Sequence, residues 1–285
     1  MGADALPTTA AAMDGFFLRA TRDELTSQQL TSRLAETRNI PKHNPEAKQA
    51  SEAYPLELLA DPSLLNSLPW KELLAASVDE DKLAALAASG RHPEYVLGRL
   101  GAVRDAESQE RAAKAAAYLS LLLRFAEAAP RRGAFPASWL TEPPAVAGEE
   151  EGGGRKGSKG GFGAPPRVAA HLQSRFTETE GAGGEQPRCG RPQALCDLLT
   201  SHILVLALQL SQPAYQLDYN AVARALRTEP VKMLKHLNVM GCKIRKPAGE
   251  QPRAVLMPDC GPEMTLADFL PSSYMRAKAS GSKYK

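Results

Sequence analysis

The sequence between Pro230 and Cys260 reads PVKMLKHLNVMGCKIRKPAGEQPRAVLMPDC and contains six Lys or Arg residues against two Asp or Glu residues. Lysine and arginine side chains neutralise nucleic-acid phosphates and release counterions, which gives affinity without sequence preference. Base reading needs Arg, Asn or Gln side chains directed at base edges, and near these lysines only Asn238 qualifies, so we expect weak sequence specificity. The candidates for contact with double-stranded DNA are Lys232, Lys235, His236, Lys243, Arg245, Lys246 and Arg253.

The charge of the chain is distributed unevenly along its 285 residues. Of the 35 Lys and Arg and 32 Asp and Glu, residues 224–285 hold 12 and 5, which leaves 23 and 27 for the rest of the chain. A cationic C-terminal fifth beside a slightly acidic remainder indicates an anionic partner. The same pattern is also typical of a solvated helix face or of a module that docks on an acidic protein, and the sequence leaves these alternatives open.

Three helices followed by a hairpin would position these cations. The run from Ala194 is apolar on nearly all sides and predicts a buried helix, a short helix follows at 219–228, and Pro230 suits the first position of a third helix. Gly241 predicts a left-handed residue that ends this helix. Two strands then flank the turn PAGEQP. This is the element order of a winged helix, in which the hairpin forms a wing beside the third helix.

Periodicity predicts the direction of the side chains in both elements. On the third helix we expect four apolar residues, three apart, to face the core: Val231, Leu234, Leu237 and Met240. Alternation in the first strand places Cys242, Ile244 and Lys246 on one face, and Lys243 with Arg245 on the other. The wing should therefore be basic on its exposed side and near its tip.

The rest of the chain predicts a mainly α fold with small β-hairpins. Four helical patterns between Tyr54 and Pro130 indicate a first domain, and Gly-rich segments indicate a flexible insertion. Arg99 and Arg104, on the expected third helix of that domain, are further candidates for DNA contact.

Several classes of site and protein are disfavoured by the sequence. The four cysteines form no CxxC pair and have no histidine pair at metal-ligand spacing, so we expect no metal site and no cofactor. The start of the chain has no signal-peptide pattern, and the apolar run from Ile203 is too short to span a bilayer. The segment GGGRKGSKGGFG lacks the spacing of a phosphate loop, and GxSxG and HExxH motifs are absent, so we expect no enzyme activity.

Four segments together resemble a known family: AYPLELL, HPEYVLGRL, AAYLSLLLRF and HILVLALQLSQPAYQLDYNAVARALRTEPVKMLKHLNVMGCKI. From about Glu52 to Pro258 the chain is similar to the forty-nine-kilodalton subunit family of RNA polymerase I, called polymerase-associated factor fifty-three in animals. The resemblance implies a non-catalytic subunit in the nucleus and nucleolus, with other polymerase subunits and double-stranded DNA as partners. It also implies a tandem winged helix preceded by an extended linker, with the division 1–54 (linker), 55–140 (first winged helix), 141–164 (insertion), 165–262 (second winged helix) and 263–285 (basic tail). The tandem winged helix would bind DNA and support initiation and elongation of ribosomal RNA transcription.

The resemblance also implies two features outside the winged helices. Residues 20–54 would form the linker that runs along the polymerase. Family members carry an N-terminal barrel that forms a heterodimer with a smaller subunit, but nothing before Phe16 has the alternating strands of a barrel. The sequence is therefore expected either to be a fragment or to lack that domain. The alternative function is that of a winged-helix scaffold for protein interactions in a nuclear transcription complex, without direct DNA binding.

Overall fold

The protein is described by a computed structural model that covers residues 40–130, 133–144, 161–180, 187–246, 251–258, 261 and 263–271. Residues 1–39 of the expected linker, 145–160 of the expected insertion, 247–250 of the expected turn and 272–285 of the expected tail lie outside the described residues. The described part belongs to one compact unit that begins at Ile40.

Short helices precede the first long one, and capping residues set several of their ends. Asp61 accepts a hydrogen bond from the Ser63 amide (2.8 Å) at the start of α4, and Asp79 accepts one from the Lys82 amide (3.1 Å) at the start of α6. Gly90, with φ of 61°, ends α6. The helices are α2 (Ala50–Ala53), α3 (Leu56–Leu59), α4 (Pro62–Ser67), α5 (Trp70–Val78), α6 (Glu80–Ser89), α7 (Glu94–Leu97), α8 (Leu100–Arg104) and α9 (Gln109–Ala128).

The long helix α9 begins a series of elements that closes in a small antiparallel sheet. After α9 the chain forms β1 (Phe135–Pro136), the 3₁₀ helix η1 (Ala137–Leu140), α10 (Pro166–Phe176), β2 (Glu178–Glu180) and β3 (Arg188–Gly190). The strand order is β1-β3-β2, so the first strand pairs with the third. The outer strands β1 and β2 therefore both bond to β3, the last strand of the series.

The next series repeats this arrangement. It consists of α11 (Gln193–Gln209), β4 (Gln216–Leu217), α12 (Tyr219–Ala225), α13 (Pro230–Val239), β5 (Cys242–Arg245) and β6 (Arg253–Leu256), and α14 (Leu266–Phe269) follows it. The strand order β4-β6-β5 again pairs the first strand with the third. Both series have the helix, strand, helix, helix, strand, strand order of a winged helix. The predicted fold class, mainly α with small β-hairpins, is confirmed.

The pairing of β1 differs from the domain division expected from the sequence. Phe135 of β1 lies opposite Cys189 of β3. The first sheet therefore draws its strands from both sides of the expected insertion, and its third helix is α10 rather than a helix before residue 140. We call α9 through β3 the first winged-helix unit and α11 through β6 the second. Helices α2 to α8 precede both units.

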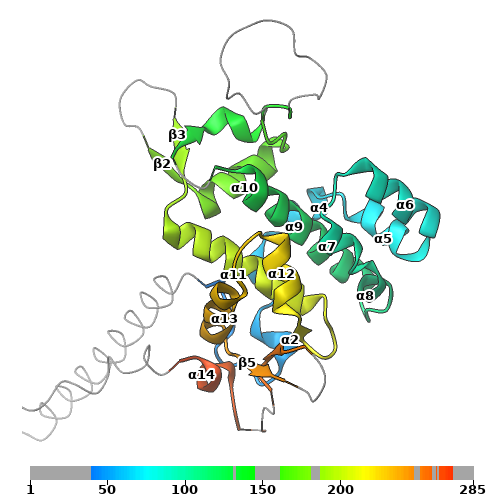
Figure 1. Cartoon of the computed structure of the whole chain (residues 1–285), viewed down its shortest axis with the longest axis vertical. Coiled ribbons are helices and arrows are strands. Elements are labelled where there is room, and N and C mark those ends of the chain that lie inside the picture. Colours follow the sequence, from blue (N-terminus) through cyan, green and yellow to red (C-terminus); the bar gives the residue numbers. More distant parts are fainter. Residues whose placement is uncertain are drawn as a thin grey trace, which may run out of the picture. The chain divides into compact units, whose positions relative to one another are not determined.

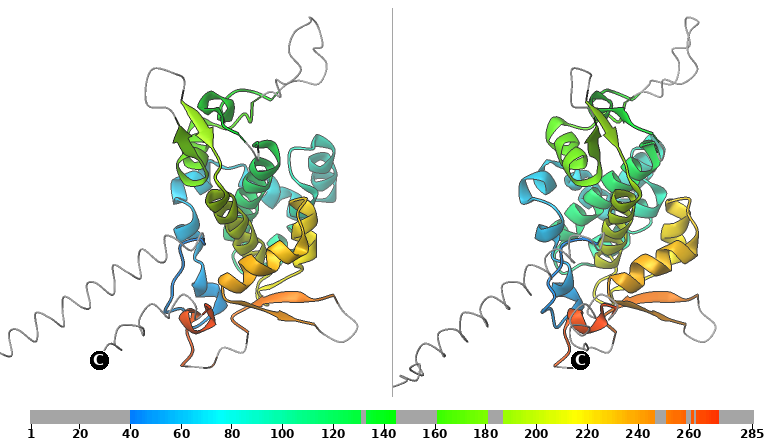
Figure 2. Two further views of the ribbon diagram at one scale, coloured as in Figure 1. Left: turned by 60° about the vertical axis from the view of Figure 1, so that its left-hand side comes forward. Right: turned by 90° about the vertical axis from the view of Figure 1, so that its left-hand side faces the viewer.

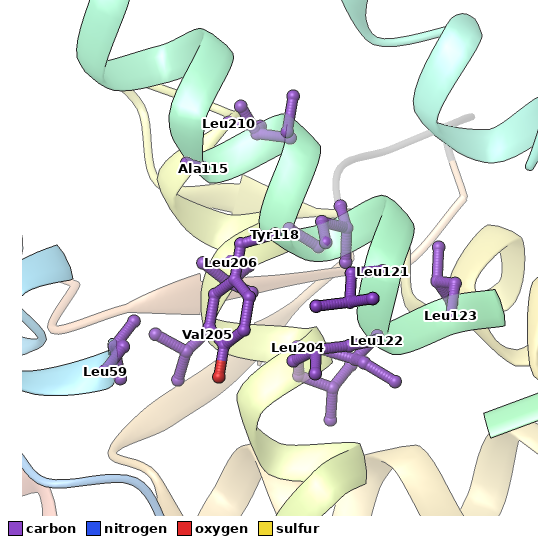
Figure 3. Close-up of a cluster of buried hydrophobic side chains, with 14 of the residues drawn as sticks. Leu59, Ala115, Tyr118, Leu121, Leu122, Leu123, Leu204, Val205, Leu206 and Leu210 are labelled. Carbon is purple, nitrogen blue, oxygen red and sulfur yellow. The ribbon is translucent and has the colours of Figure 1, made fainter. Parts of the chain in front are cut away.

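The core of the two units is continuous. In Figure 3, Leu121 and Leu122 of α9 lie beside Leu204 of α11, and Tyr118 lies beside Val205 and Leu206. Leu122, Leu204 and Leu206 have no exposed surface, which confirms that the apolar run from Ile203 is a buried helix. Helix α5 packs on α9 as well, so α9 lies between the early helices and α11 (Figure 1).

Residues 40–54 differ from the extended linker that the sequence suggested. The Leu266 and Ala267 amides of α14 donate hydrogen bonds to the carbonyls of Ala47 (2.9 Å) and Pro45 (3.1 Å). The Tyr54 hydroxyl donates to the Met240 carbonyl at the end of α13 (2.9 Å). Tyr54 is 2% exposed and Ala47 is fully buried, because this segment contributes to the core of its own chain.

Candidate nucleic-acid interface

Helix α13 confirms its predicted start at Pro230, but its buried side is rotated from the predicted one. Leu237 and Met240 are buried as expected, and Leu234 is half-buried. Val231, expected in the core, is 62% exposed, and Met233 is 2% exposed in its place. An α-helix has 3.6 residues per turn, so residues spaced strictly three apart move gradually around the helix. The buried residues Met233, Leu237 and Met240 are four and three apart and therefore stay on one side.

The two lysines of α13 point to solvent. Lys232 is exposed, and its Nζ lies 3.7 Å from Glu229 Oε2, a surface ion pair of little strength. Lys235 is exposed, and among the described residues no carboxylate lies within 4.0 Å of its amine. Asn238 is exposed as well. The solvent face of α13 can therefore offer two cations and one amide to a nucleic acid.

His236 lies on a different side of α13 from these lysines. Its ring is half-buried against α11, with Nδ1 at 3.3 Å from Ser201 Oγ and Nε2 at 3.8 Å from Asp197 Oδ1. Burial lowers the pKa of His236, opposed by the Asp197 carboxylate. We therefore omit it from the proposed DNA contacts. These three residue types also form catalytic triads, but Ser201 is fully buried, so its hydroxyl cannot reach a substrate.

The wing begins at Gly241, where the predicted left-handed residue is confirmed with φ of 85°. Strand β5 pairs with β6 in a register that sets Cys242 opposite Leu256 and Ile244 opposite Ala254. Three of these four side chains are buried, whereas Ile244, nearer the turn than Cys242, is 38% exposed. The face of the hairpin that carries Cys242 therefore packs on the core.

The opposite face of the hairpin carries the cations. Arg245 lies directly opposite Arg253, and both are exposed. Lys246 follows Arg245 and is exposed too. Lys243, nearer the start of the wing, has its Nζ 5.2 Å from the centroid of the Phe269 ring in α14.

The structure brings the helix and the wing together at one end of the unit. Both views in Figure 2 show the β5–β6 hairpin running alongside α13, with the far end of the hairpin toward the first turn of the helix. Lys232 belongs to that first turn, and Arg245, Lys246 and Arg253 belong to the far end of the hairpin. A phosphate backbone laid across this end could meet cations from both elements.

Arg99 and Arg104 occupy a different part of the molecule. Arg99 is half-buried at the start of α8, with its guanidinium 5.5 Å from the centroid of the Tyr95 ring. The Arg104 Nε donates to Asp105 Oδ1 at 2.9 Å, and this carboxylate raises the pKa of Arg104. Both arginines lie at the ends of α8, which precedes both winged-helix units, and the third helix of the first unit is α10.

Sequence reasoning missed the role of α14 in the site. Thr265 and Asp268 form a capping box at its start, in which the Thr265 amide donates to Asp268 Oδ2 at 2.8 Å. This helix carries Phe269, over which Lys243 lies. The signal was present in the sequence as TLAD, a Thr followed three residues later by an acidic residue.

Among the described residues, no group of His, Cys, Asp or Glu side chains could hold a metal ion, and none of the helices could cross a bilayer. No curated protein matches the chain. A family model described as A49-like RNA polymerase I associated factor matches residues 3–265.

Proposed function

The chain belongs to the A49-like RNA polymerase I associated factor family, and from this premise we propose that its second winged-helix unit binds double-stranded DNA with little sequence specificity. In this proposal the protein is a subunit of DNA-directed RNA polymerase I that supports initiation and elongation of ribosomal RNA transcription. Family membership makes other polymerase subunits its partners and the nucleus its compartment, and we propose the nucleolus within it. We also propose that it has no catalytic site of its own.

One observation carries the proposal. The wing holds Arg245 opposite Arg253, with Lys246 next to them, and the lysines of α13 lie on the element alongside. Such a group of exposed cations neutralises successive phosphates without reading bases. Asn238 is the exposed amide near them on α13, which supports weak rather than strict sequence preference.

The test is the affinity of the full chain for a labelled, arbitrary duplex, measured by fluorescence anisotropy at several salt concentrations. With about four or five phosphates neutralised, the logarithm of the affinity should fall against the logarithm of salt with a slope of about −4, from about 0.9 counterions per contact. Two unrelated duplex sequences should bind within about threefold of each other.

An absent or salt-independent signal would refute the proposal. The alternative is that the same surface docks on an acidic protein of the transcription complex. Capture of polymerase subunits from a nuclear extract distinguishes the two functions. If the polymerase subunits are still captured after nuclease treatment and also by the charge-reversed wing, the wing is not needed for protein contact and the DNA proposal stands. If capture resists nuclease but is lost when the charges of the wing are reversed, the protein-docking alternative is supported.

A further inference from the structure

A cavity of about 340 Å³ lies outside the proposed DNA site, between α9, the end of α4 and the segment before α10. Its walls are largely apolar and include Leu68, Leu121, Phe162 and Val168. This volume is at the lower end of the range for ligand pockets. The cavity therefore has room for one large apolar side chain rather than for an extended small molecule.

Arg124 places a positive charge at the edge of this cavity. Its guanidinium lies 5.4 Å from the centroid of the Phe162 ring, and its side chain is exposed. Among the described residues, no carboxylate lies within 4.0 Å of it. Partial burial and the nearby Arg91 both lower the pKa of Arg124. An anionic group bound here would be attracted by both arginines and would pair with Arg124.

His92 and Ser120 form the polar part of the wall. The His92 Nδ1 lies 2.9 Å from Ser120 Oγ, and both residues are buried. Burial, with a contribution from Arg124, lowers the pKa of His92, so the imidazole is neutral at pH 7. Arg124 is thus the cation that lines the cavity at this pH, and the remaining wall favours an apolar group.

We propose that this cavity binds a short segment of a protein partner that presents an aromatic side chain next to a carboxylate. The aromatic ring fills the apolar walls and the carboxylate pairs with Arg124. A protein partner is favoured because the cavity holds a single anchor side chain, as hot spots at protein interfaces do, and because the family consists of polymerase-associated factors. The proposal does not depend on DNA binding.

The test uses the fluorescein-labelled peptide Gly-Glu-Phe-Glu-Gly and the full chain, with binding followed by anisotropy. The matched peptides Gly-Lys-Phe-Lys-Gly and Gly-Glu-Gly-Glu-Gly lack the acidic groups and the aromatic ring, respectively. We expect saturable binding of the first peptide and at least about tenfold weaker binding of the other two. Equal binding of the acidic and basic peptides would overturn the proposal.

Variants of the chain locate the binding. Arg124→Gln should weaken binding of the first peptide about tenfold, because it removes the charged partner of the peptide carboxylates from an exposed position without disturbing the core. Arg111→Gln is the matched control on the same helix, where the arginine pairs with Glu57 at 3.1 Å, and should change affinity less than twofold. Ala164→Leu, which fills the cavity, should also weaken binding.

Two results would overturn the assignment. One is equal loss of peptide affinity in the Arg124 and Arg111 variants, which would indicate nonspecific attraction. The other is stronger peptide binding when Glu149, Glu150 and Glu151 are all changed to Gln, which would make the acidic stretch of the chain itself the occupant. DNA affinity measured on the same samples should be unchanged in Arg124→Gln, so failure of this proposal is distinguishable from failure of the DNA proposal.

Discussion

The two winged-helix units share a strand order but present different surfaces. In the first unit the solvent side of α10 carries Arg167 and Ser174, and the wing carries Glu178 and Arg188, which donates to the Ala134 carbonyl at 2.8 Å. In the second unit the corresponding helix and wing hold six exposed cations. The same scaffold therefore carries a strongly cationic surface in one position and a nearly neutral surface in the other, because side chains rather than topology determine the surface charge.

The largest difference between the two units is expected in the loss of DNA affinity on charge reversal. In the variant Lys235→Glu, Arg245→Glu, Lys246→Glu and Arg253→Glu, the loss of about four phosphate contacts at about 0.15 M salt predicts an affinity for duplex DNA that is lower by about 10²- to 10³-fold. Anisotropy titrations of the full chain measure this change. Circular dichroism should show a folded protein, because all four side chains are exposed.

The matched control for this variant lies in the first unit. Arg167→Glu with Arg188→Glu should change the DNA affinity by less than about threefold, because two separated cations form no continuous phosphate-binding surface. A comparable loss in both variants would show that both units contact DNA, and the contrast between them would not hold.

A core substitution tests whether the units are energetically separate. Leu122→Ala in α9 removes a fully buried side chain beside α11 and should lower the free energy of unfolding by about 2–5 kcal/mol. Because the core is continuous, amide exchange should accelerate in the sheets of both units, as measured by mass spectrometry. Leu58→Ala, at a side chain that is 42% exposed, is the control and should cost less than about 1 kcal/mol. Acceleration in the first unit alone would contradict a shared core.

Each unit also holds a histidine whose pKa is lowered by burial, fully buried in the case of His202 and partly buried in the case of His171, which predicts a dependence of stability on pH. Burial lowers the pKa of His202 in α11 to about 3 and that of His171 in α10 to about 4. As the pH falls below about 6.5 the unfolded chain takes up protons first, so stability is retained above this pH and is lost toward pH 4. For the fully buried His202 the loss approaches about 1.4 kcal/mol per pH unit.

Urea unfolding at pH 7, 6 and 5 measures this dependence. The His202→Gln variant should show a flatter profile, since its side chain does not titrate in this range. His171→Gln should flatten it less, because His171 is partly exposed and its Nε2 already lies 2.9 Å from the Tyr118 hydroxyl. A wild-type stability that is constant from pH 7 to 5 would contradict the assignment of both imidazoles as neutral.

The smallest effect is expected outside both units. Arg104→Ala removes an exposed pair with Asp105 that solvent screens, so the free energy of unfolding should not change measurably in urea titrations. Its DNA affinity should stay within about twofold of the wild type, because Arg104 precedes both units. A larger loss of affinity would restore Arg104 as a DNA contact and extend the interface to α8.

Local patterns predicted the second unit much better than the first. The buried helix from Ala194, the start of α13 at Pro230, the left-handed Gly241 and the hairpin after it are all adjacent in the sequence, so periodicity and turn residues were sufficient. In the first unit, strands β1, β2 and β3 have two or three residues each, too few to show alternation. The long segment between η1 and α10 also separates β1 from β2 and β3 in the sequence, so their pairing could not be predicted from neighbouring residues.

The sequence by itself determined which segments are apolar helices, where the cations concentrate and to which family the chain belongs. These depend on residue types and their spacing within single elements. The tertiary structure alone decided that β1 pairs with β3, that His236 turns toward α11 and that residues 40–54 pack on their own chain. Each of these depends on a neighbour that lies far away in the sequence, and no local pattern encodes the choice of that neighbour.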